Sequence, residues 1–298
     1  MPVDFNVIDI QHIDAAWLQQ KKISLDVLRL DKMHEVVSGN KWFKLKYYLQ
    51  QAEANNKTTI ATFGGAWSNH IIATAFAAQE AGLKSVGIIR GEKPAILSET
   101  LQLALNFEMK LIYVTRDQYR HKKALVEAYE HENWFWISEG GYGATGADGA
   151  ADMLTTIDTS HYTHIIAAVG TGTMLAGLIL SSTKSQQIIG ISSMKGNLAL
   201  EEQVRKLLPA AGMQKNFTIF HDYHFGGYGK HPHQLIDFIN DAYKQYQLPL
   251  DIVYTGKTFF AIKDLTEKSF FQPASQILMI HSGGLQGNKS LPPQVLAF

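Results

Sequence analysis

Short apolar runs alternate with segments of helical character along most of this chain, and this alternation constrains its fold more than any other feature. The runs are apolar at consecutive positions rather than at every second one, which is typical of strands covered on both faces. Strands that alternate with helices build βαβ units, so we predict an α/β fold with mostly parallel sheets. The expected strands span residues 25–30, 58–63, 85–90, 110–115, 163–169, 187–192 and 277–281, and the expected helices span residues 69–81 and 98–106.

Three loops that follow expected strands are rich in Gly, Ser, Thr or Asn. They are G-G-A-W-S-N-H at residues 64–70, G-T-G-T at residues 170–173 and H-S-G-G at residues 281–284. Ligands of open parallel sheets bind at the carboxyl ends of the strands. The sequence therefore predicts that a binding site lies where these loops meet.

The G-T-G-T loop follows an apolar run and opens an expected helix. Backbone N–H groups and the helix dipole favour a phosphate at such a position, and threonine hydroxyls add donors. A dinucleotide fingerprint needs Gly or Ala where this chain has Leu175, and no Walker lysine follows. The loop thus indicates either a small phosphate site or a tight turn with a capped helix.

Ser68, Asn69 and His70 stand at a strand-to-helix junction. Ser68 or Asn69 is expected to cap the helix, and the functional alternative is that both side chains face a ligand. A Ser-His-acid triad on a nucleophile elbow is disfavoured, because the G-x-S-x-G pattern is missing around Ser68.

Three lysines follow a Gly-Asn turn in the stretch S-G-N-K-W-F-K-L-K, residues 38–46. On the first turns of a helix they are expected to be solvated. The alternative is that Lys41 or Lys44 is a reactive amine, and spacing alone does not separate these two.

The segment 221–233 contains four of the twelve histidines, but their spacing matches no standard zinc pattern. We expect a solvated loop and no metal. Tyr228 lies between two glycines of this loop, which can place its phenol in a cleft. Tyr254 is either a packed core tyrosine or a phenol that faces the site, and Ser282 is a candidate ligand contact at the end of the last strand.

Composition excludes several classes of protein. Lys plus Arg and Asp plus Glu balance at 27 each, which gives no drive toward nucleic acid or membrane surfaces. The chain has no cysteine, so disulfides and thiolate metal sites are excluded. No signal peptide and no apolar run near the ~20 residues of a membrane span are present, which predicts a cytoplasmic enzyme.

Several motifs in a fixed order resemble those of one family. They are S-G-N-K-x-x-K-L, G-G-x-x-S-N-H, E-G-G-Y-G-A-T-G, G-T-G-T, G-Y-G, V-Y-T-G-K and H-S-G-G, between about residues 28 and 284. The set resembles the pyridoxal-phosphate enzymes 1-aminocyclopropane-1-carboxylate deaminase and D-cysteine desulfhydrase. The resemblance implies the tryptophan-synthase-β-like fold (fold type II), pyridoxal 5′-phosphate as cofactor, and a homodimer.

The resemblance also implies a role for each site residue. Lys41 would link covalently to the cofactor, and Lys44 would assist at the phosphate or tune the site. The other implied cofactor contacts are Gly170, Thr171, Gly172 and Thr173 at the phosphate, Asn69 at the 3′-oxygen and Ser282 at the pyridine nitrogen. Ser68, Tyr228 and Tyr254 would be catalytic, and Trp67, Ser68, Asn69 and His70 would face the substrate.

Position 255 bears on the substrate that the resemblance implies. The deaminases carry Glu after the tyrosine of V-Y-E-G-K, whereas this chain has Thr255, as the desulfhydrases do. The partner that the resemblance implies for the pyridine nitrogen is the hydroxyl of Ser282, which does not hold this nitrogen protonated, and the weaker electron sink suits β-elimination. We therefore expect a lyase, or hydrolase, that converts D-cysteine to pyruvate, ammonia and sulfide.

Two alternatives stay open: an aminocyclopropane carboxylate deaminase that releases 2-oxobutyrate, and a cofactor-binding protein with little turnover. Trp67, where the family often has Gln, and the altered loop after Tyr228 leave the substrate undecided. We expect a large domain of residues 1–43 plus 151–298, a small domain of residues 44–150, and an active site in the cleft between them.

Overall fold

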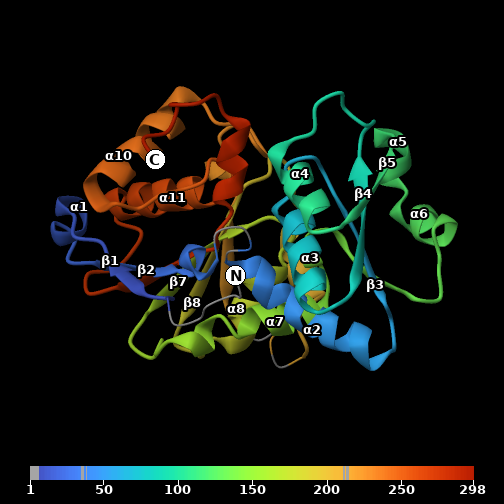
Figure 1. The fold of residues 1–298 in the computed structure, drawn as a ribbon. Helices are drawn as coiled ribbons and strands as arrows, with labels where there is room; N and C mark the ends of the chain where they lie inside the picture. The colour runs from blue at the N-terminus through green and yellow to red at the C-terminus, as the bar shows by residue number, and fades with distance from the viewer. Residues whose placement is uncertain (1–6, 35–36, 38, 211, 213–214) are drawn as a thin grey trace.

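The computed structural model describes residues 7–34, 37, 39–210, 212 and 215–298. In these residues a six-stranded sheet has the order β1-β2-β10-β7-β8-β9 and a four-stranded sheet has the order β5-β4-β3-β6. Figure 1 shows the two sheets in separate halves of the molecule, with β3, β4 and β5 on the right. The helices α2, α7 and α8 lie along the lower side, where the two halves meet.

The six-stranded sheet is parallel except for β1, which pairs antiparallel with β2. Its strands are β1 (Ile10–His12), β2 (Ser24–Arg29), β7 (His164–Val169), β8 (Gln187–Ser192), β9 (Phe217–Phe220) and β10 (Gln276–His281). Its helices are α1 (Ala16–Gln19), α8 (Thr173–Ser181), α9 (Leu200–Arg205), α10 (His233–Tyr246) and α11 (Thr255–Glu267).

Both faces of this sheet are buried, which explains its continuously apolar strands. In β7, Ile165 and Ala167 belong to the core that contains α8, whereas Ile166 points to the core that contains α10 and α11. Successive side chains of a strand point to opposite faces, so a sheet covered by helices on both sides needs an apolar residue at every position.

The four-stranded sheet is entirely parallel. Its strands are β3 (Thr59–Gly64), β4 (Lys84–Arg90), β5 (Lys110–Val114) and β6 (Trp134–Ile137). The helices of this part of the chain are α2 (Asn40–Ala54), α3 (Asn69–Glu80), α4 (Glu99–Asn106), α5 (Arg116–Arg120), α6 (Lys122–Ala128) and α7 (Ala144–Ala151). Short 3₁₀ turns are η1 (Leu30–Met33), η2 (Glu139–Gly141), η3 (Leu154–Thr156), η5 (Asp222–His224) and η6 (Leu285–Ser290).

Three of the helices that follow strands of the four-stranded sheet begin with a hydroxyl side chain as N-cap. Ser68 and Ser98 accept from the backbone N–H groups of Ile71 and Leu101, and Thr115 forms a full capping box with Gln118. Each such cap stabilises a helix by about 1 kcal/mol. The expected cap at Ser68 is therefore present.

The predicted fold class is confirmed. All seven expected strands and both expected helices are present within one or two residues of their predicted bounds. The division into a small and a large domain stays a prediction; α7, which lies inside the expected small domain, packs its Ala147 and Ala150 into the same core as Leu28 and Ile165.

Candidate active site

A cavity of about 950 Å³ opens at the carboxyl ends of strands from both sheets. The three polar loops that follow β3, β7 and β10 all line it, as the sequence predicts. The predicted site residues among its lining are Lys41, Lys44, Trp67, Ser68, Asn69, His70, Gly170, Thr171, Gly172, Tyr228, Tyr254 and Ser282. Thr173 lies behind the lining, fully buried, with its Oγ1 atom 3.1 Å from that of Thr171.

Lys41 is carried into the cavity by a close contact between two loops. The backbone of Gly39 has φ +72°, and a Cβ atom there would lie 2.0 Å from the carbonyl oxygen of Ser282. The next residue, Asn40, donates its backbone N–H to that same oxygen at 3.2 Å and starts α2. Only glycine fits at position 39, so the Gly-Asn turn sets where Lys41 enters the site. Ser38, the first residue of the motif, lies outside the described residues.

Burial in the cavity lowers the pKa of both lysines. Burial lowers the pKa of Lys41 to about 8, although Asp251 raises it. Burial, and then the charge of Lys41, lower the pKa of Lys44 well below its usual value. At pH 7 about a tenth of the Lys41 amine is neutral, and a neutral amine is the form that attacks a carbonyl.

The hydrogen-bond contacts of the two amines also differ. Lys41 donates to Asn40 Oδ1 at 2.9 Å, and the Nζ atom of Lys44 is 3.5 Å from the carbonyl oxygen of Gly140. Lys46 does not line the cavity, and it forms a partly exposed ion pair with Asp152.

The G-T-G-T loop forms a concave backbone surface at the start of α8. Gly172 has φ +86°, and a Cβ atom there would lie 2.8 Å from Val204 Cγ2. The hydroxyl groups of Thr171 and Thr173 are next to each other and to the first turn of α8. Backbone N–H groups, hydroxyl groups and the helix dipole together suit a phosphate.

Asn69 lines the cavity, and one atom of its amide has no partner within the residues that the structure describes. Its Nδ2 atom is 3.5 Å from the carbonyl oxygen of Gly284, and its buried Oδ1 atom has no hydrogen-bond partner among the described residues. A buried polar atom without a partner is costly unless a ligand satisfies it. The capping residue Ser68 and the adjacent Trp67, which is 40% exposed, complete this side of the cavity.

His70 is a neutral, buried histidine. Burial, and then Lys41 and Lys44, lower its pKa well below the usual value. Thr62 donates its hydroxyl proton to the carbonyl oxygen of Ile137, so it accepts from His70 Nε2 at 2.8 Å. The unprotonated Nδ1 atom of His70 then has no partner in the described part of the chain, and it can accept from a ligand.

The two predicted tyrosines meet in the cavity beside the G-T-G-T loop, where a Cβ atom on Gly170 would lie 3.5 Å from the Tyr254 ring. The rings of Tyr228 and Tyr254 are 6.0 Å apart at 70°, with Tyr228 half exposed. Burial, and then the neighbouring phenol of Tyr228, raise the pKa of Tyr254 well above its usual value. Tyr254 therefore stays protonated and is a hydrogen-bond donor at neutral pH.

The family profile described as pyridoxal-phosphate dependent enzyme matches residues 20–283. The chain belongs to the pyridoxal-phosphate dependent enzymes. This membership confirms the predicted family, enzyme class and cofactor.

Individual relatives of this pyridoxal-phosphate dependent enzyme carry two kinds of name. A Pyrococcus abyssi protein proposed by name to be a 1-aminocyclopropane-1-carboxylate deaminase is 29% identical, over 84% of this chain and 81% of its own length. The Arabidopsis thaliana bifunctional D-cysteine desulfhydrase/1-aminocyclopropane-1-carboxylate deaminase is 26% identical, over 84% of this chain and 70% of its own. A solved structure of an aminocyclopropane carboxylate deaminase homologue shares the fold, with a TM-score of 0.81 at 24% identity over 94% of this chain and 90% of that one.

The residues of this pyridoxal-phosphate dependent enzyme fit its cofactor. The Oδ1 atom of Asn69, without a partner among the described residues, can accept from a 3′-hydroxyl group, the Gly170–Thr173 loop suits the phosphate, and the amine of Lys41, with its lowered pKa, suits the aldehyde. Ser282, at the end of β10, is the hydroxyl expected at the pyridine nitrogen. The individual roles of these residues stay predictions.

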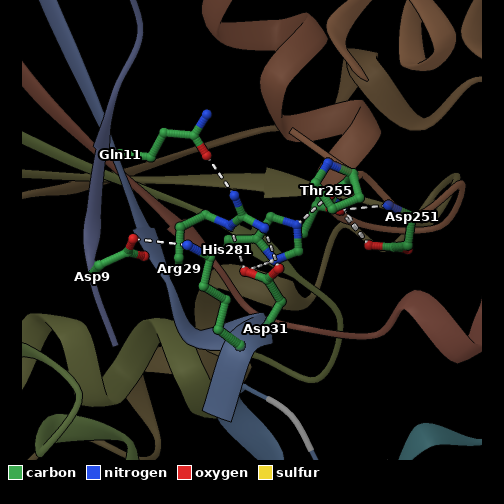
Figure 2. Close-up of polar contacts among 9 residues, drawn as sticks. Asp9, Gln11, Arg29, Asp31, Asp251, Thr255 and His281 are labelled. Carbon is green, nitrogen blue, oxygen red and sulfur yellow. Dashed lines mark hydrogen bonds and ion pairs between the residues drawn. The ribbon is translucent and has the colours of Figure 1, made fainter. Parts of the chain in front are cut away.

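Sequence reasoning missed a buried ionic cluster at His281, the residue before Ser282, in this pyridoxal-phosphate dependent enzyme (Figure 2). The register of the sheet places His281 beside Arg29, at the ends of β10 and β2. Arg29 binds Asp31 with two hydrogen bonds of 2.8 and 2.6 Å, and Asp31 Oδ1 is 3.2 Å from His281 Nδ1. Burial raises the pKa of Asp31, but His281 and then Arg29 outweigh it, and the net pKa is lowered.

His281 joins this cluster to the segment that carries Tyr254. Its Nε2 atom donates to the carbonyl oxygen of Pro249 at 2.7 Å, while Nδ1 faces the carboxylate of Asp31. Acceptor oxygens therefore lie on both sides of the His281 ring. His281 thereby connects three segments of the site. They are the end of β10, which Ser282 follows, η1, whose Leu30 accepts from the N–H of Gly39, and the loop before α11, which carries Tyr254.

Asp251 was also missed, although the D-x-x-Y-T spacing is a signal for a turn with a capping carboxylate. Its Oδ1 atom accepts from the N–H groups of Val253 and Tyr254 at 2.8 and 2.7 Å. Its Oδ2 atom accepts from the N–H and hydroxyl of Thr255 at 2.8 and 2.6 Å, as Figure 2 shows. This fully buried carboxylate fixes the start of α11 and hence Tyr254.

Metal binding and membrane-spanning helices were the two remaining features considered from the sequence. Among the described residues no group of three or more His, Cys, Asp or Glu is placed to hold a metal ion, and His221 of the histidine-rich segment pairs with Glu201 instead. No helix in the described ranges is both long and apolar enough to cross a bilayer. The cytoplasmic location stays a prediction.

Proposed function

We propose that this enzyme removes ammonia from a small amino acid that carries a leaving group on Cβ, with D-cysteine as the first candidate. The products would be pyruvate, ammonia and sulfide. The bifunctional name of the Arabidopsis relative and the deaminase names of other relatives support an ammonia-releasing reaction in this branch of the family.

The observation that favours elimination is the lack of a free carboxylate around the cavity. Among the described lining residues Glu139 alone is acidic, and Lys122 and Tyr119 bind it at 2.8 and 2.9 Å. Thr255 lies outside the lining, and its hydroxyl is committed to Asp251. A neutral partner such as Ser282 leaves the pyridine nitrogen unprotonated, which suits a reaction in which the leaving group takes the electrons.

The residues of the chain divide the work of this reaction. Bound pyridoxal phosphate supplies an electron sink for the charge that develops at Cα. Ser68 and Asn69 would hold the substrate carboxylate, and the Nζ atom of Lys41 would take the Cα proton. Tyr254, which stays protonated, would donate a hydrogen bond to the departing sulfur, with Tyr228 beside it.

The reaction class is that of a lyase, and the second expected class, hydrolase, was wrong. In the proposed reaction the bond at Cβ breaks by elimination, and water enters only when the released enamine decays to the 2-oxo acid. The deaminase and desulfhydrase names among the relatives agree with this class.

A screen of D- and L-amino acids with detection of 2-oxo acid, ammonia and sulfide tests the proposal. We expect D-cysteine to give all three products, and Lys41→Ala to be colourless and inactive with cofactor present. Turnover of D-cysteine by colourless Lys41→Ala protein would contradict the proposal.

The deaminase alternative has its own support and its own test. Several relatives are named 1-aminocyclopropane-1-carboxylate deaminase. Release of 2-oxobutyrate from that substrate, without sulfide from D-cysteine, would establish the alternative. A holoprotein that releases no ammonia from any amino acid would instead be a cofactor-binding protein with little turnover.

A further inference from the structure

Positive charge is concentrated at the outer part of the cavity, although the chain as a whole is neutral with 27 residues of each sign. Four cations of the half that contains β4 and β5 line this part: Arg90, Arg116, Arg120 and Lys122. Against them stands a single acidic residue, Glu139, among the described lining residues. A cleft lined by one sign of charge attracts ligands of the opposite sign.

The carboxylate of Glu139 does not neutralise the three arginines of the cavity, because it binds Lys122 and Tyr119 instead. Glu139 pairs with Lys122 at 2.8 Å and accepts from the Tyr119 hydroxyl at 2.9 Å. Burial, and then the charge of Glu139, raise the pKa of Tyr119, which keeps this phenol a donor. The ammonium of Lys122 also lies over the Tyr119 ring, 4.8 Å from its centre.

The three arginines come from the ends of neighbouring strands. Arg90 ends β4 and is in register with Val114, the last residue of β5, after which α5 carries Arg116 and Arg120. Arg120 has one distant partner, Asp117, at 3.6 Å between two exposed side chains. In the part of the chain that the structure describes, neither Arg90 nor Arg116 forms an ion pair.

Arg90 lies next to the loop that is expected to hold the substrate. A Cβ atom on Gly65 would be 3.4 Å from Arg90 Nη2, and Gly65 is followed by Ala66, Trp67 and Ser68. The guanidinium also lies over the ring of Tyr119, 5.8 Å from its centre. The predicted phosphate loop belongs to the other sheet, at the end of β7, so the arginines flank the substrate loop instead.

We propose that Arg90, Arg116 and Arg120 bind a second anionic group on the substrate, so that the enzyme, besides D-cysteine, also takes small amino acids whose β-substituent is an oxyanion. Guanidinium groups bind phosphate and sulfate oxygens with paired hydrogen bonds. The proposal rests on the proposed β-elimination. The bond from Cβ to the ester oxygen breaks with its electrons on the departing anion, and the Cα proton passes to the protein. Water then converts released 2-aminoacrylate to pyruvate and ammonia.

The test compares anionic and neutral β-substituted alanines on the holoenzyme. O-phosphoserine and serine O-sulfate, as D and L forms, are set against β-chloroalanine, with pyruvate release at low and high salt. We expect kcat/KM for at least one anionic ester to exceed that for β-chloroalanine by about tenfold or more at low salt, and to fall as salt rises.

Variants locate the effect. Arg90→Gln and Arg116→Gln should each lower kcat/KM for the anionic ester about tenfold and leave β-chloroalanine within about twofold. Lys84→Gln, which removes a charge at the opposite end of the same strand β4, should change neither. Titration of each apoprotein with pyridoxal phosphate should give unchanged cofactor affinity.

The possible failures can be told apart. Turnover of β-chloroalanine without preference for an ester overturns the second-anion proposal alone. Weaker cofactor binding by the arginine variants overturns it too, because the arginines would then serve the cofactor. Absence of turnover of all three compounds, with no change of the cofactor's absorption on adding the esters, overturns both this proposal and the elimination on which it rests.

Discussion

Gly39 and Gly196 share a backbone φ of +72°, but their surroundings differ. A Cβ atom on Gly39 would lie 2.0 Å from Ser282 O, whereas nothing lies within 4 Å of one on Gly196. Gly39→Ala must therefore move the Gly-Asn turn or the end of β10, and both movements displace Lys41 from Ser282. We expect Gly39→Ala to lose cofactor absorbance.

Gly196→Ala is the matched control, because it imposes the same backbone strain in open space. It should cost about 1 kcal/mol of unfolding free energy and keep the cofactor. Cofactor titration and denaturant unfolding of both variants check this. Equal cofactor binding by the two variants would show that the contact with Ser282 does not position Lys41.

His281 provides a second comparison between residues. His281→Leu removes the donor to Pro249 O and the ring nitrogen that faces Asp31, from a side chain that is fully buried. Loss of one partner from a buried charge cluster typically costs about 3 kcal/mol. The free energy of unfolding measured in urea should fall by about that amount.

The control is His12→Leu, because His12 also pairs with an aspartate, at 2.7 Å from Asp26, but its side chain is 64% exposed. An exposed pair of this kind contributes about 0.5 kcal/mol or less. If both variants lost the same stability, the buried cluster would have no special part in holding β10 and the loop before α11 together.

At the scale of elements, Lys257 of α11 holds the loop that carries Tyr228. Its ammonium is fully buried and donates to the carbonyl oxygens of His224 and Gly227, both at 2.9 Å. Lys257→Met fills similar space but leaves both carbonyls unsatisfied, which costs about 1–3 kcal/mol. We expect faster limited proteolysis of residues 225–230 and lower kcat/KM, with cofactor affinity retained.

Lys263→Met is the control on the same helix. Lys263 forms an exposed pair with Glu267 at 2.5 Å, so its replacement should leave proteolysis and kcat/KM nearly unchanged. If proteolysis of the loop were the same in both variants, some contact other than Lys257 would hold Tyr228.

At the scale of the whole molecule, the family resemblance leads us to propose a homodimer. The surface has large apolar side chains that a partner subunit could cover, such as Ile96 and Leu198, which are 84% and 81% exposed. Light scattering of the holoprotein should give twice the chain mass of 33.2 kDa. A mass of one chain at micromolar concentration would contradict the dimer.

Local patterns predicted the fold and the loops of the site but not the interactions that hold the loops together. Continuous apolar runs identified the long central strands, whereas β1, β6 and β9 have only three or four residues and were missed. Caps such as Ser68 act over three or four residues and can be read from sequence. Arg29 and His281 are some 250 residues apart, and only the sheet register brings them together.

The same limit applied to the choice between Lys41 and Lys44. Both lysines reach one cavity and both have lowered pKa values, so their difference depends on surrounding groups that spacing does not encode. The resemblance assigned the covalent role to Lys41. The contact of Gly39 with Ser282, which fixes the residue before Asn40 and Lys41, gives this assignment a structural reason.

Borohydride reduction of the holoprotein, followed by mass spectrometry of its peptides, tests the assignment of the covalent amine most directly. Reduction fixes the cofactor to whichever amine holds it. The geometry of the α2 start predicts a pyridoxyl group on Lys41 and none on Lys44. A pyridoxyl group on Lys44, or no modified lysine in a holoprotein that releases ammonia, would contradict the assignment.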